Sequence, residues 1–166
     1  MSSTQVGRLP GMRDLRGGAY RRIKEVADRL DSFAEERGYE AVQTPVLEET
    51  ELFARKSGGE LTGQLYSFVD KGNREVSLRP EMTPSLARIL GARSRGMSKP
   101  IRWFSLPQLF RYERQQRGRL KEHFQWNVDV VGEAGLAADA EILAVAIDGL
   151  RELGLTSEDF VARVSD

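Results

Sequence analysis

The chain has 166 residues and no net charge, because 25 lysines and arginines balance 25 aspartates and glutamates. This balance argues against a protein that holds nucleic acid through its overall charge, but it does not exclude a local basic patch. With no cysteine and one histidine, disulfides, thiolate chemistry and multi-histidine metal sites are excluded. No apolar run reaches the roughly 18 residues of a membrane helix, and the N-terminus lacks a secretory signal. We therefore expect a cytoplasmic protein with no membrane partner, folded as one compact domain or two small ones.

The first elements follow from turn residues and apolar periodicity. A polar arm ends at Pro10-Gly11, a pair typical of turns. From Ala19 to Arg37 apolar residues recur every three or four positions, which predicts an amphipathic helix ended by Gly38. A short strand is expected over 39–43, before Thr44-Pro45.

The next segments predict a hairpin and a short helix. Strands over 65–69 and 75–78 flank Asp70-Lys71-Gly72-Asn73, which suits a hairpin turn. A helix is expected from Pro84 to about Gly91, because proline fits the first turn of a helix.

The second half of the chain completes the predicted fold class. Its expected elements are two long strands over 101–114 and 120–132, a second amphipathic helix over 136–153 ended by Gly154, and a last strand over 160–164. Hairpin strands with helices before and after them predict the α+β class, with an antiparallel sheet covered by helices on one face. Since the chain stops two residues after the last strand, we expect this sheet to be incomplete.

Polar and apolar residues alternate along 123–131. In a strand this places His123, Gln125, Asn127 and Asp129 on one face. A half-solvated antiparallel strand usually has this pattern, and the alternation alone favours that interpretation over a polar pocket.

The preceding strand shifts the balance towards a binding site. Arg111 and Glu113 lie two residues apart and point to the same side. A guanidinium matches phosphate or carboxylate, and a neighbouring carboxylate can orient it, although a solvated salt bridge is the alternative. The connecting loop adds a group of cations around Gly118, which predicts a local anion site or, alternatively, a solvated turn: Arg114, Arg117, Arg119 and Lys121.

A third candidate site is the segment from Leu78 to Pro84. Thr83 stands where a helix N-cap is expected, which would make the segment a simple connector. Alternatively, the Glu81 carboxylate held rigidly beside the Thr83 hydroxyl would suit a bound ammonium group.

Together these segments resemble the class II aminoacyl-tRNA synthetase core and, more narrowly, the histidyl-tRNA synthetases. The resemblance covers about Leu9 to Val164 and rests on these motifs: Pro10-Gly11-Met12-Arg13-Asp14, Thr44-Pro45-Val46-Leu47-Glu48, Leu78-Arg79-Pro80-Glu81-Met82-Thr83, and Phe110-Arg111-Tyr112-Glu113-Arg114 followed by Gly118-Arg119, Gln125, Asp129 and Gly132.

The resemblance implies that residues 1–166 are the N-terminal portion of a class II catalytic domain. Motif 1, near Thr44 and Pro45, implies a homodimer, and motif 2 over 110–132 implies an ATP site. Motif 3 and an anticodon-binding domain have no counterpart in the sequence. The implied activity is a histidine–tRNA ligase that activates histidine with ATP, accompanied by Mg²⁺, and transfers it to tRNA(His).

The resemblance also implies individual roles. Arg111 would be the catalytic residue, binding the α-phosphate and the histidine carboxylate. ATP would further contact Glu113, Arg119 and His123; histidine would contact Glu81, Met82, Thr83, Gln125 and Asp129. No residue is assigned to a metal. His123 and Gln115 depart from the family, which usually has an adenine-stacking aromatic and a loop proline at these positions.

Two other functions fit the same resemblance. One is the synthetase-like regulatory subunit of ATP phosphoribosyltransferase, which senses histidine; Arg111, Glu113 and Arg119 favour the ligase, because a sensor needs no triphosphate ligands. The other is a non-catalytic dimerisation or tRNA-associated module that binds neither ligand.

Overall fold

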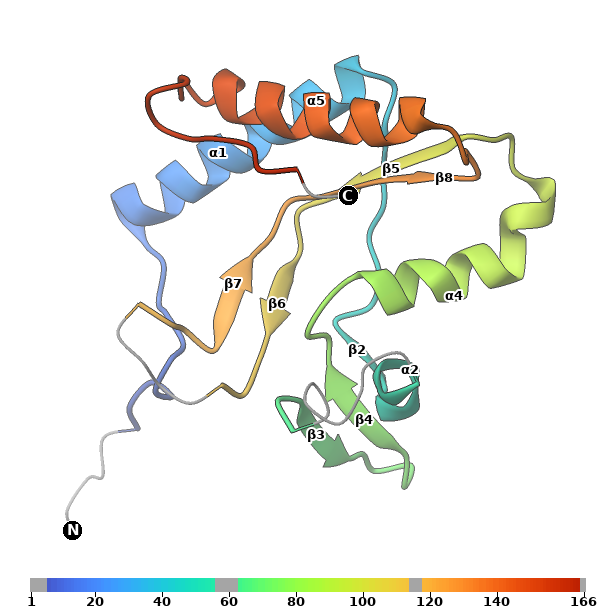
Figure 1. Cartoon of the computed structure of the whole chain (residues 1–166). Coiled ribbons are helices and arrows are strands. Elements are labelled where there is room, and N and C mark those ends of the chain that lie inside the picture. Colours follow the sequence, from blue (N-terminus) through green and yellow to red (C-terminus); the bar gives the residue numbers. More distant parts are fainter. Residues whose placement is uncertain (1–5, 56–62, 114–117, 165–166) are drawn as a thin grey trace, which may run out of the picture. The chain divides into compact units, whose positions relative to one another are not determined.

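The computed structural model describes residues 6–55, 63–113 and 118–164, and the chain divides into two compact units (Figure 1). The first unit comprises Met1–Leu15, Thr44–Ser94 and Pro107–Gln125. The second unit comprises Arg16–Gln43, Arg95–Leu106 and Trp126–Asp166. No helix among the described residues is long and apolar enough to cross a membrane.

The second unit packs two helices on a three-stranded sheet. Its elements are α1 (Gly17–Glu36), β1 (Glu40–Ala41), β5 (Ile101–Ser105), β8 (Asn127–Val131) and α5 (Leu136–Glu152). The strand order is β1-β5-β8, with β1 parallel and β8 antiparallel to β5. The core joins both helices to the sheet through Phe33, Ala34, Tyr39, Phe104 and Val145, with Trp126, Val128 and Val130 packed against it.

Both long helices and their glycine ends are confirmed, but the apolar stripe predicted for α5 is wrong. Leu136, Leu143 and Leu150 of that stripe are exposed, and the buried residues of α5 are Val145 and Gly149. In α1 the buried residues are Leu30, Phe33 and Ala34, one stripe of the helix. Gly38 follows with φ +79°, and Gly154 follows α5 with φ +90°, the left-handed conformation that glycine adopts at little cost.

The first unit contains two small antiparallel sheets and two helices. Its elements are β2 (Leu47–Glu49), α2 (Thr50–Ala54), β3 (Tyr66–Val69), β4 (Glu75–Leu78), α4 (Thr83–Arg93), β6 (Gln108–Phe110) and β7 (Glu122–Phe124). One sheet has the order β2-β4-β3, and the other pairs β6 with β7. A single 3₁₀ turn, η1 (Ser94–Gly96), follows α4. The hairpin turn predicted between β3 and β4 is confirmed, with Asn73 at φ +59° and the Asp70 carboxylate accepting the Gly72 amide.

Two strand predictions were wrong. The predicted long strands over 101–114 and 120–132 are each divided, into β5 and β6 and into β7 and β8. The break falls at Pro107, which has no N–H to donate to a ladder, although both ladders keep the same residue offset. Residues 160–164 form no strand, since no described strand pairs with them.

The expected purely antiparallel sheet also needs correction, because β1 is parallel to β5. The sequence analysis gave no strand for Leu47–Glu49 and no helix for Thr50–Ala54. Both elements are too short for a periodic pattern to develop. The α+β class is nevertheless confirmed.

Candidate functional site

The β6–β7 hairpin provides the frame of the candidate site in the first unit. Leu109 lies opposite His123 in the ladder and has no exposed surface. The segment 79–83 runs beside β6, because the Phe110 amide donates to the Arg79 carbonyl oxygen at 3.0 Å. The hairpin and the 79–83 segment, two separate stretches of sequence, are thereby held together.

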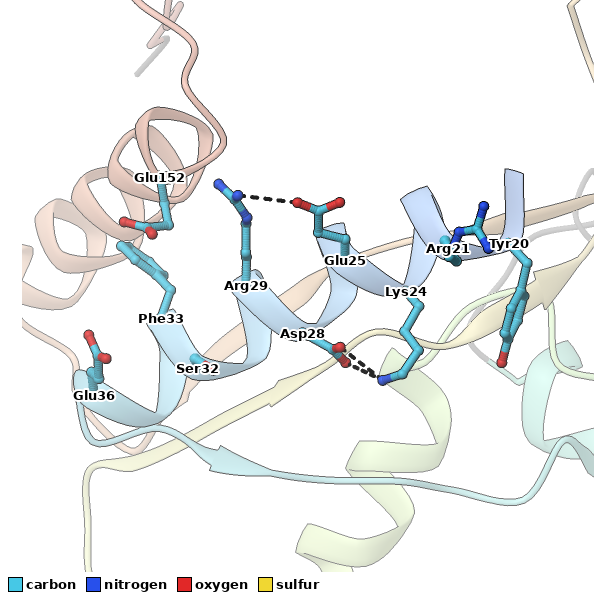
Figure 2. A pocket seen from close by; sticks show the side chains of 10 residues that line it. All are labelled: Tyr20, Arg21, Lys24, Glu25, Asp28, Arg29, Ser32, Phe33, Glu36 and Glu152. Carbon is cyan, nitrogen blue, oxygen red and sulfur yellow. Dashed lines mark hydrogen bonds and ion pairs between the residues drawn. The ribbon is translucent and has the colours of Figure 1, made fainter. Parts of the chain in front are cut away.

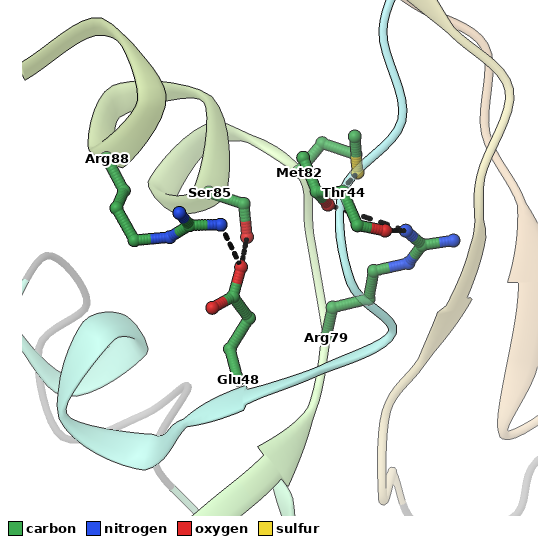
Figure 3. A network of polar contacts seen from close by, with 6 residues as sticks. All are labelled: Thr44, Glu48, Arg79, Met82, Ser85 and Arg88. Carbon is green, nitrogen blue, oxygen red and sulfur yellow. Dashed lines mark hydrogen bonds and ion pairs between the residues drawn. The ribbon is translucent and has the colours of Figure 1, made fainter. Parts of the chain in front are cut away.

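The Arg79 side chain connects the Thr44 segment to β6. Arg79 is only 2% exposed. Its Nη1 donates to the Thr44 carbonyl oxygen at 2.8 Å (Figure 3). Its Nε donates to the Gln108 carbonyl oxygen at 3.1 Å. Burial lowers the pKa of the Arg79 guanidinium from its usual value. The sequence analysis gave Arg79 no ligand role, and the structure shows it joining the Thr44 segment to β6.

Arg111 lies against the segment that contains Glu81. Its Nε donates to the Pro80 carbonyl oxygen at 3.1 Å, and its backbone amide donates to the Lys121 carbonyl oxygen at 3.0 Å. The first bond holds the half-buried guanidinium and the second holds the main chain of Arg111, immediately beyond the end of β6. A cation fixed in this way can bind a phosphate or carboxylate without first being ordered.

Glu113 pairs with a loop arginine. Its Oε2 accepts a hydrogen bond from Arg119 Nη1 at 2.9 Å, and Arg119 is largely exposed whereas Glu113 is half-buried. The salt bridge of Glu113 is therefore with Arg119, whereas the predicted alternative paired Glu113 with Arg111. Lys121, the other described cation of the loop, places its Nζ 4.0 Å from the centre of the Tyr112 ring. Arg114, Gln115 and Arg117 lie outside the described residues.

His123 faces the same polar cluster. Burial lowers the pKa of its imidazole, the positive charge of Arg111 lowers it further, and a hydrogen bond with Gln125 and the charge of Glu113 oppose these effects. The structure therefore brings His123 close to Arg111, Glu113 and Gln125. Of the four residues that the alternation placed on one face, only His123 and Gln125 belong to this unit. The opposite face is less regular, because Phe124 is 38% exposed.

The segment before α4 differs from the prediction at Thr83. Thr83 is the first residue of α4, and Met82 occupies the N-cap position without a side-chain cap bond. The predicted cap is therefore wrong; the Thr83 side chain is exposed instead. Met82 has no exposed surface, and its sulfur accepts a hydrogen bond from the Thr44 hydroxyl at 3.4 Å. Met82 thus supports the segment from within the core, next to half-buried Glu81.

Asp129 belongs to the second unit. It lies on β8 opposite Trp103, on the sheet face away from α1 and α5, since its neighbours Val128 and Val130 pack against the core beneath those helices. It shares that face with Asn127, as the alternation predicted.

The sequence analysis missed a buried carboxylate of the hairpin. Glu122 is 5% exposed and accepts hydrogen bonds from the Arg13 amide at 2.8 Å and from Gln108 Nε2 at 2.6 Å. The available signal was a charged residue at a strand position that shares its face with Phe124. A second polar network in this unit joins Glu48 to Ser85 and Arg88 (Figure 3).

Among the described residues, neither a metal cluster nor the groove along α1 coincides with this site. Within 6–55, 63–113 and 118–164, no three acidic or histidine side chains are grouped so as to hold a metal ion. A groove of about 580 Å³ in the second unit lies along α1 (Figure 2). Four of its charged residues are paired within the helix, Lys24 with Asp28 and Arg29 with Glu25. None of the predicted ligand residues lines the groove.

Comparison with known protein families shows to which family the chain belongs. The family model described as histidyl-tRNA synthetase matches residues 11–162. The chain belongs to the histidyl-tRNA synthetase family. Histidine–tRNA ligase of Halorubrum lacusprofundi is 46% identical over 157 residues, 95% of this chain and 36% of its own length. The chloroplastic/mitochondrial ligase of Arabidopsis thaliana is 44% identical over 151 residues, 91% of this chain and 30% of its own length.

Solved structures agree with this family assignment. Histidyl-tRNA synthetase of S. aureus has a TM-score of 0.78 and 27% identity, covering 92% of this chain and 36% of its own. A Bacillus halodurans structure described as an ATP phosphoribosyltransferase regulatory subunit/histidyl-tRNA synthetase has a TM-score of 0.83 and 27% identity, covering 95% of this chain and 40% of its own. The chain thus spans little more than a third of its curated synthetase relatives.

Proposed function

We propose that this chain forms part of the ATP- and histidine-binding region of a histidine–tRNA ligase, residues 1–166 being the N-terminal portion of the catalytic domain with motifs 1 and 2. The observation that supports this most is the placement of Arg111. Its guanidinium is held on the Pro80 carbonyl oxygen, beside the segment with Glu81 and Thr83. A residue suited to binding phosphate therefore lies next to residues suited to binding the ammonium group of an amino acid.

The proposed reaction is histidine activation. A carboxylate oxygen of histidine attacks the α-phosphorus of ATP, the bond to the β-phosphate oxygen breaks, and pyrophosphate leaves with that electron pair. The protein supplies alignment and charge neutralisation rather than a nucleophile. Arg111 would bind the α-phosphate oxygen and the histidine carboxylate, reducing their mutual repulsion.

ATP would be held by the residues around the hairpin. Arg119 is exposed and its partner Glu113 is close, so Arg119 could exchange that ion pair for a terminal phosphate while Glu113 turns to the adenine side. His123 would lie against the adenine, and its lowered pKa favours the neutral ring for such a contact.

By the family resemblance, the histidine ligands would be acidic and polar groups of the first unit together with Asp129 of the second unit. Glu81 and Thr83 would bind the α-ammonium group with help from Gln125, and Asp129 would face the imidazole. Met82 would contribute by packing, since it is fully buried.

The remaining partners follow from the same proposal. Among the described residues no cluster of carboxylates would hold Mg²⁺ by itself, so Mg²⁺ would arrive bound to the ATP phosphates. The chain would form a homodimer through the Thr44–Pro45 region. Its acceptor would be tRNA(His), and its location would be cytoplasmic.

Histidine-dependent ATP–pyrophosphate exchange tests the activity. The purified chain is expected to exchange label above an Arg111→Ala variant, and omission of histidine should abolish the signal. Equal exchange by the wild-type chain and Arg111→Ala would show that Arg111 takes no part in the reaction.

The similarity to the Bacillus halodurans structure favours a regulatory subunit as the second candidate. Such a subunit would bind histidine with no ATP requirement. Calorimetry showing histidine binding without any ATP binding would support it over the ligase.

A further inference from the structure

Glu122 is a buried carboxylate to which the proposed ligand contacts give no role. It lies on β7 opposite Phe110 and is 5% exposed. One carboxylate oxygen accepts from the Arg13 amide at 2.8 Å and from Arg13 Nε at 3.3 Å; the other accepts from Gln108 Nε2 at 2.6 Å. A buried carboxylate is tolerated only when it is paired and hydrogen-bonded, so these contacts make Glu122 a fixed junction.

The residues before α1 meet β7 at a second point. The Lys121 amide donates to the Gly11 carbonyl oxygen at 2.9 Å, next to Glu122 in sequence. Gly11 has φ +85°, and a Cβ at that position would lie 2.7 Å from Lys121 Cγ. The segment 9–14, here called the N-terminal arm, therefore lies along β7 at a position that favours glycine.

Lys121, the residue just before β7, contacts Arg111 directly. The Lys121 carbonyl oxygen accepts the Arg111 amide at 3.0 Å, and Arg111 Nε then donates to the Pro80 carbonyl oxygen. Hydrogen bonds thus join Arg13 to Glu122 and Arg111 to Lys121, and the peptide bond between Lys121 and Glu122 links the two sets of contacts.

We infer that Glu122 is a positioning residue: held by Arg13 of the N-terminal arm, it fixes β7 so that Arg111 stays directed at its anionic ligand. The ligand part of this inference rests on the proposed function, whereas the series of contacts does not. A displacement of about 1 Å at a ligand-binding cation is enough to weaken binding strongly. The arm is accordingly a part of the nucleotide site, although none of its residues is proposed to touch ATP.

Hydrogen exchange tests the positioning without any ligand. In Glu122→Gln the Arg13 ion pair and one acceptor are lost while the shape is kept. We expect the Arg111 and Lys121 backbone amides to exchange at least about tenfold faster, measured by NMR on the ligand-free chain. Glu75→Gln, an exposed carboxylate on β4 of the same unit, is the matched control and should leave both rates unchanged. Unchanged amide exchange in Glu122→Gln would overturn the inference.

ATP affinity tests the consequence. Glu122→Gln should bind ATP about tenfold more weakly than the wild type, while in an Arg111→Lys background the same change should have little further effect, because Glu122 acts through Arg111. An equal loss in both backgrounds would show a general structural role and contradict the inference.

These experiments distinguish failure of the proposed ATP binding from failure of the positioning role of Glu122. If the wild-type chain binds no ATP, the nucleotide proposal fails, and the amide exchange rates alone decide whether Glu122 positions Arg111. If Glu122→Gln does not fold, Arg13→Gln removes the ion pair from the other side and leaves the buried carboxylate bonded to Gln108. The same exchange and affinity results are expected for that variant, and unchanged rates would overturn the inference.

Discussion

At the scale of single residues, His123 reports on the electrostatics of the hairpin. Because this is the chain's one histidine, its ring signals can be assigned in an NMR titration without ambiguity. Burial and the charge of Arg111 disfavour the cation, so we expect the imidazole to titrate below pH 6.5. A midpoint at or above pH 6.5 would contradict the described environment.

The same shift has a consequence for stability. A histidine whose pKa is lower in the folded than in the unfolded chain contributes stability above the unfolded value and loses it as the pH falls. The free energy of unfolding should therefore decrease below pH 6.5 more steeply in the wild type than in His123→Gln. Urea unfolding followed between pH 7.5 and 5 measures the difference; parallel curves would contradict it.

Glu141 predicts a loss of stability in the same direction, at lower pH. Its carboxylate accepts hydrogen bonds from Arg102 Nε and from the Tyr39 hydroxyl, both at 2.6 Å, and these lower its pKa to about 2. The stabilisation is complete above pH 4.5 and is lost as the pH falls towards 2. Glu141→Gln should cost about 2 kcal/mol at neutral pH and flatten the acid dependence of urea unfolding. Glu158→Gln, an exposed carboxylate, serves as the control.

At the scale of elements, two helical glycines give a matched pair. In α5 a Cβ on Gly149 would lie 2.7 Å from Trp126 Cζ3, whereas a Cβ on Gly91 of α4 would meet nothing within 4 Å. Gly149→Ala should destabilise by about 1–3 kcal/mol, because Trp126 packs against the core of the second unit. Gly91→Ala should stabilise by about 0.5–1 kcal/mol, because alanine favours the helix.

Thermal unfolding of the two variants checks this pair. A rise in midpoint for Gly91→Ala and a fall for Gly149→Ala are expected. A Gly149→Ala chain as stable as the wild type would show that Trp126 is not packed closely against α5.

The elements predicted correctly are those with a strong local pattern. Apolar residues repeating along one helical face identified α1 and α5, and Gly38 and Gly154 marked their ends. The strands were harder, because Pro107 interrupts a hairpin whose residue pairing otherwise continues with one offset. The expected strand over 160–164 failed because a β pattern produces a strand only where another strand pairs with it.

At the scale of the whole molecule, the sequence predicted the polar cluster better than the buried residues that hold it in place. Alternation placed His123 and Gln125 on one face, and spacing placed Arg111 and Glu113 together, as the structure has them. Arg79 and Glu122 were missed as structural anchors, because their partners are far away in the sequence: Thr44 for Arg79 and Arg13 for Glu122. Such long-range contacts leave no periodic pattern in a single sequence.

We propose above all that the Arg111 guanidinium binds a phosphate group of ATP. Titration calorimetry of ATP should therefore show binding to the wild-type chain and at least about a hundredfold weaker binding to Arg111→Ala, since a charge-assisted bidentate contact is lost. Arg88→Ala is the matched control, because Arg88 is an exposed arginine of the same unit that pairs with Glu48. Retained affinity in Arg88→Ala with loss in Arg111→Ala is the result predicted here; equal ATP affinity of the wild type and Arg111→Ala would contradict the account.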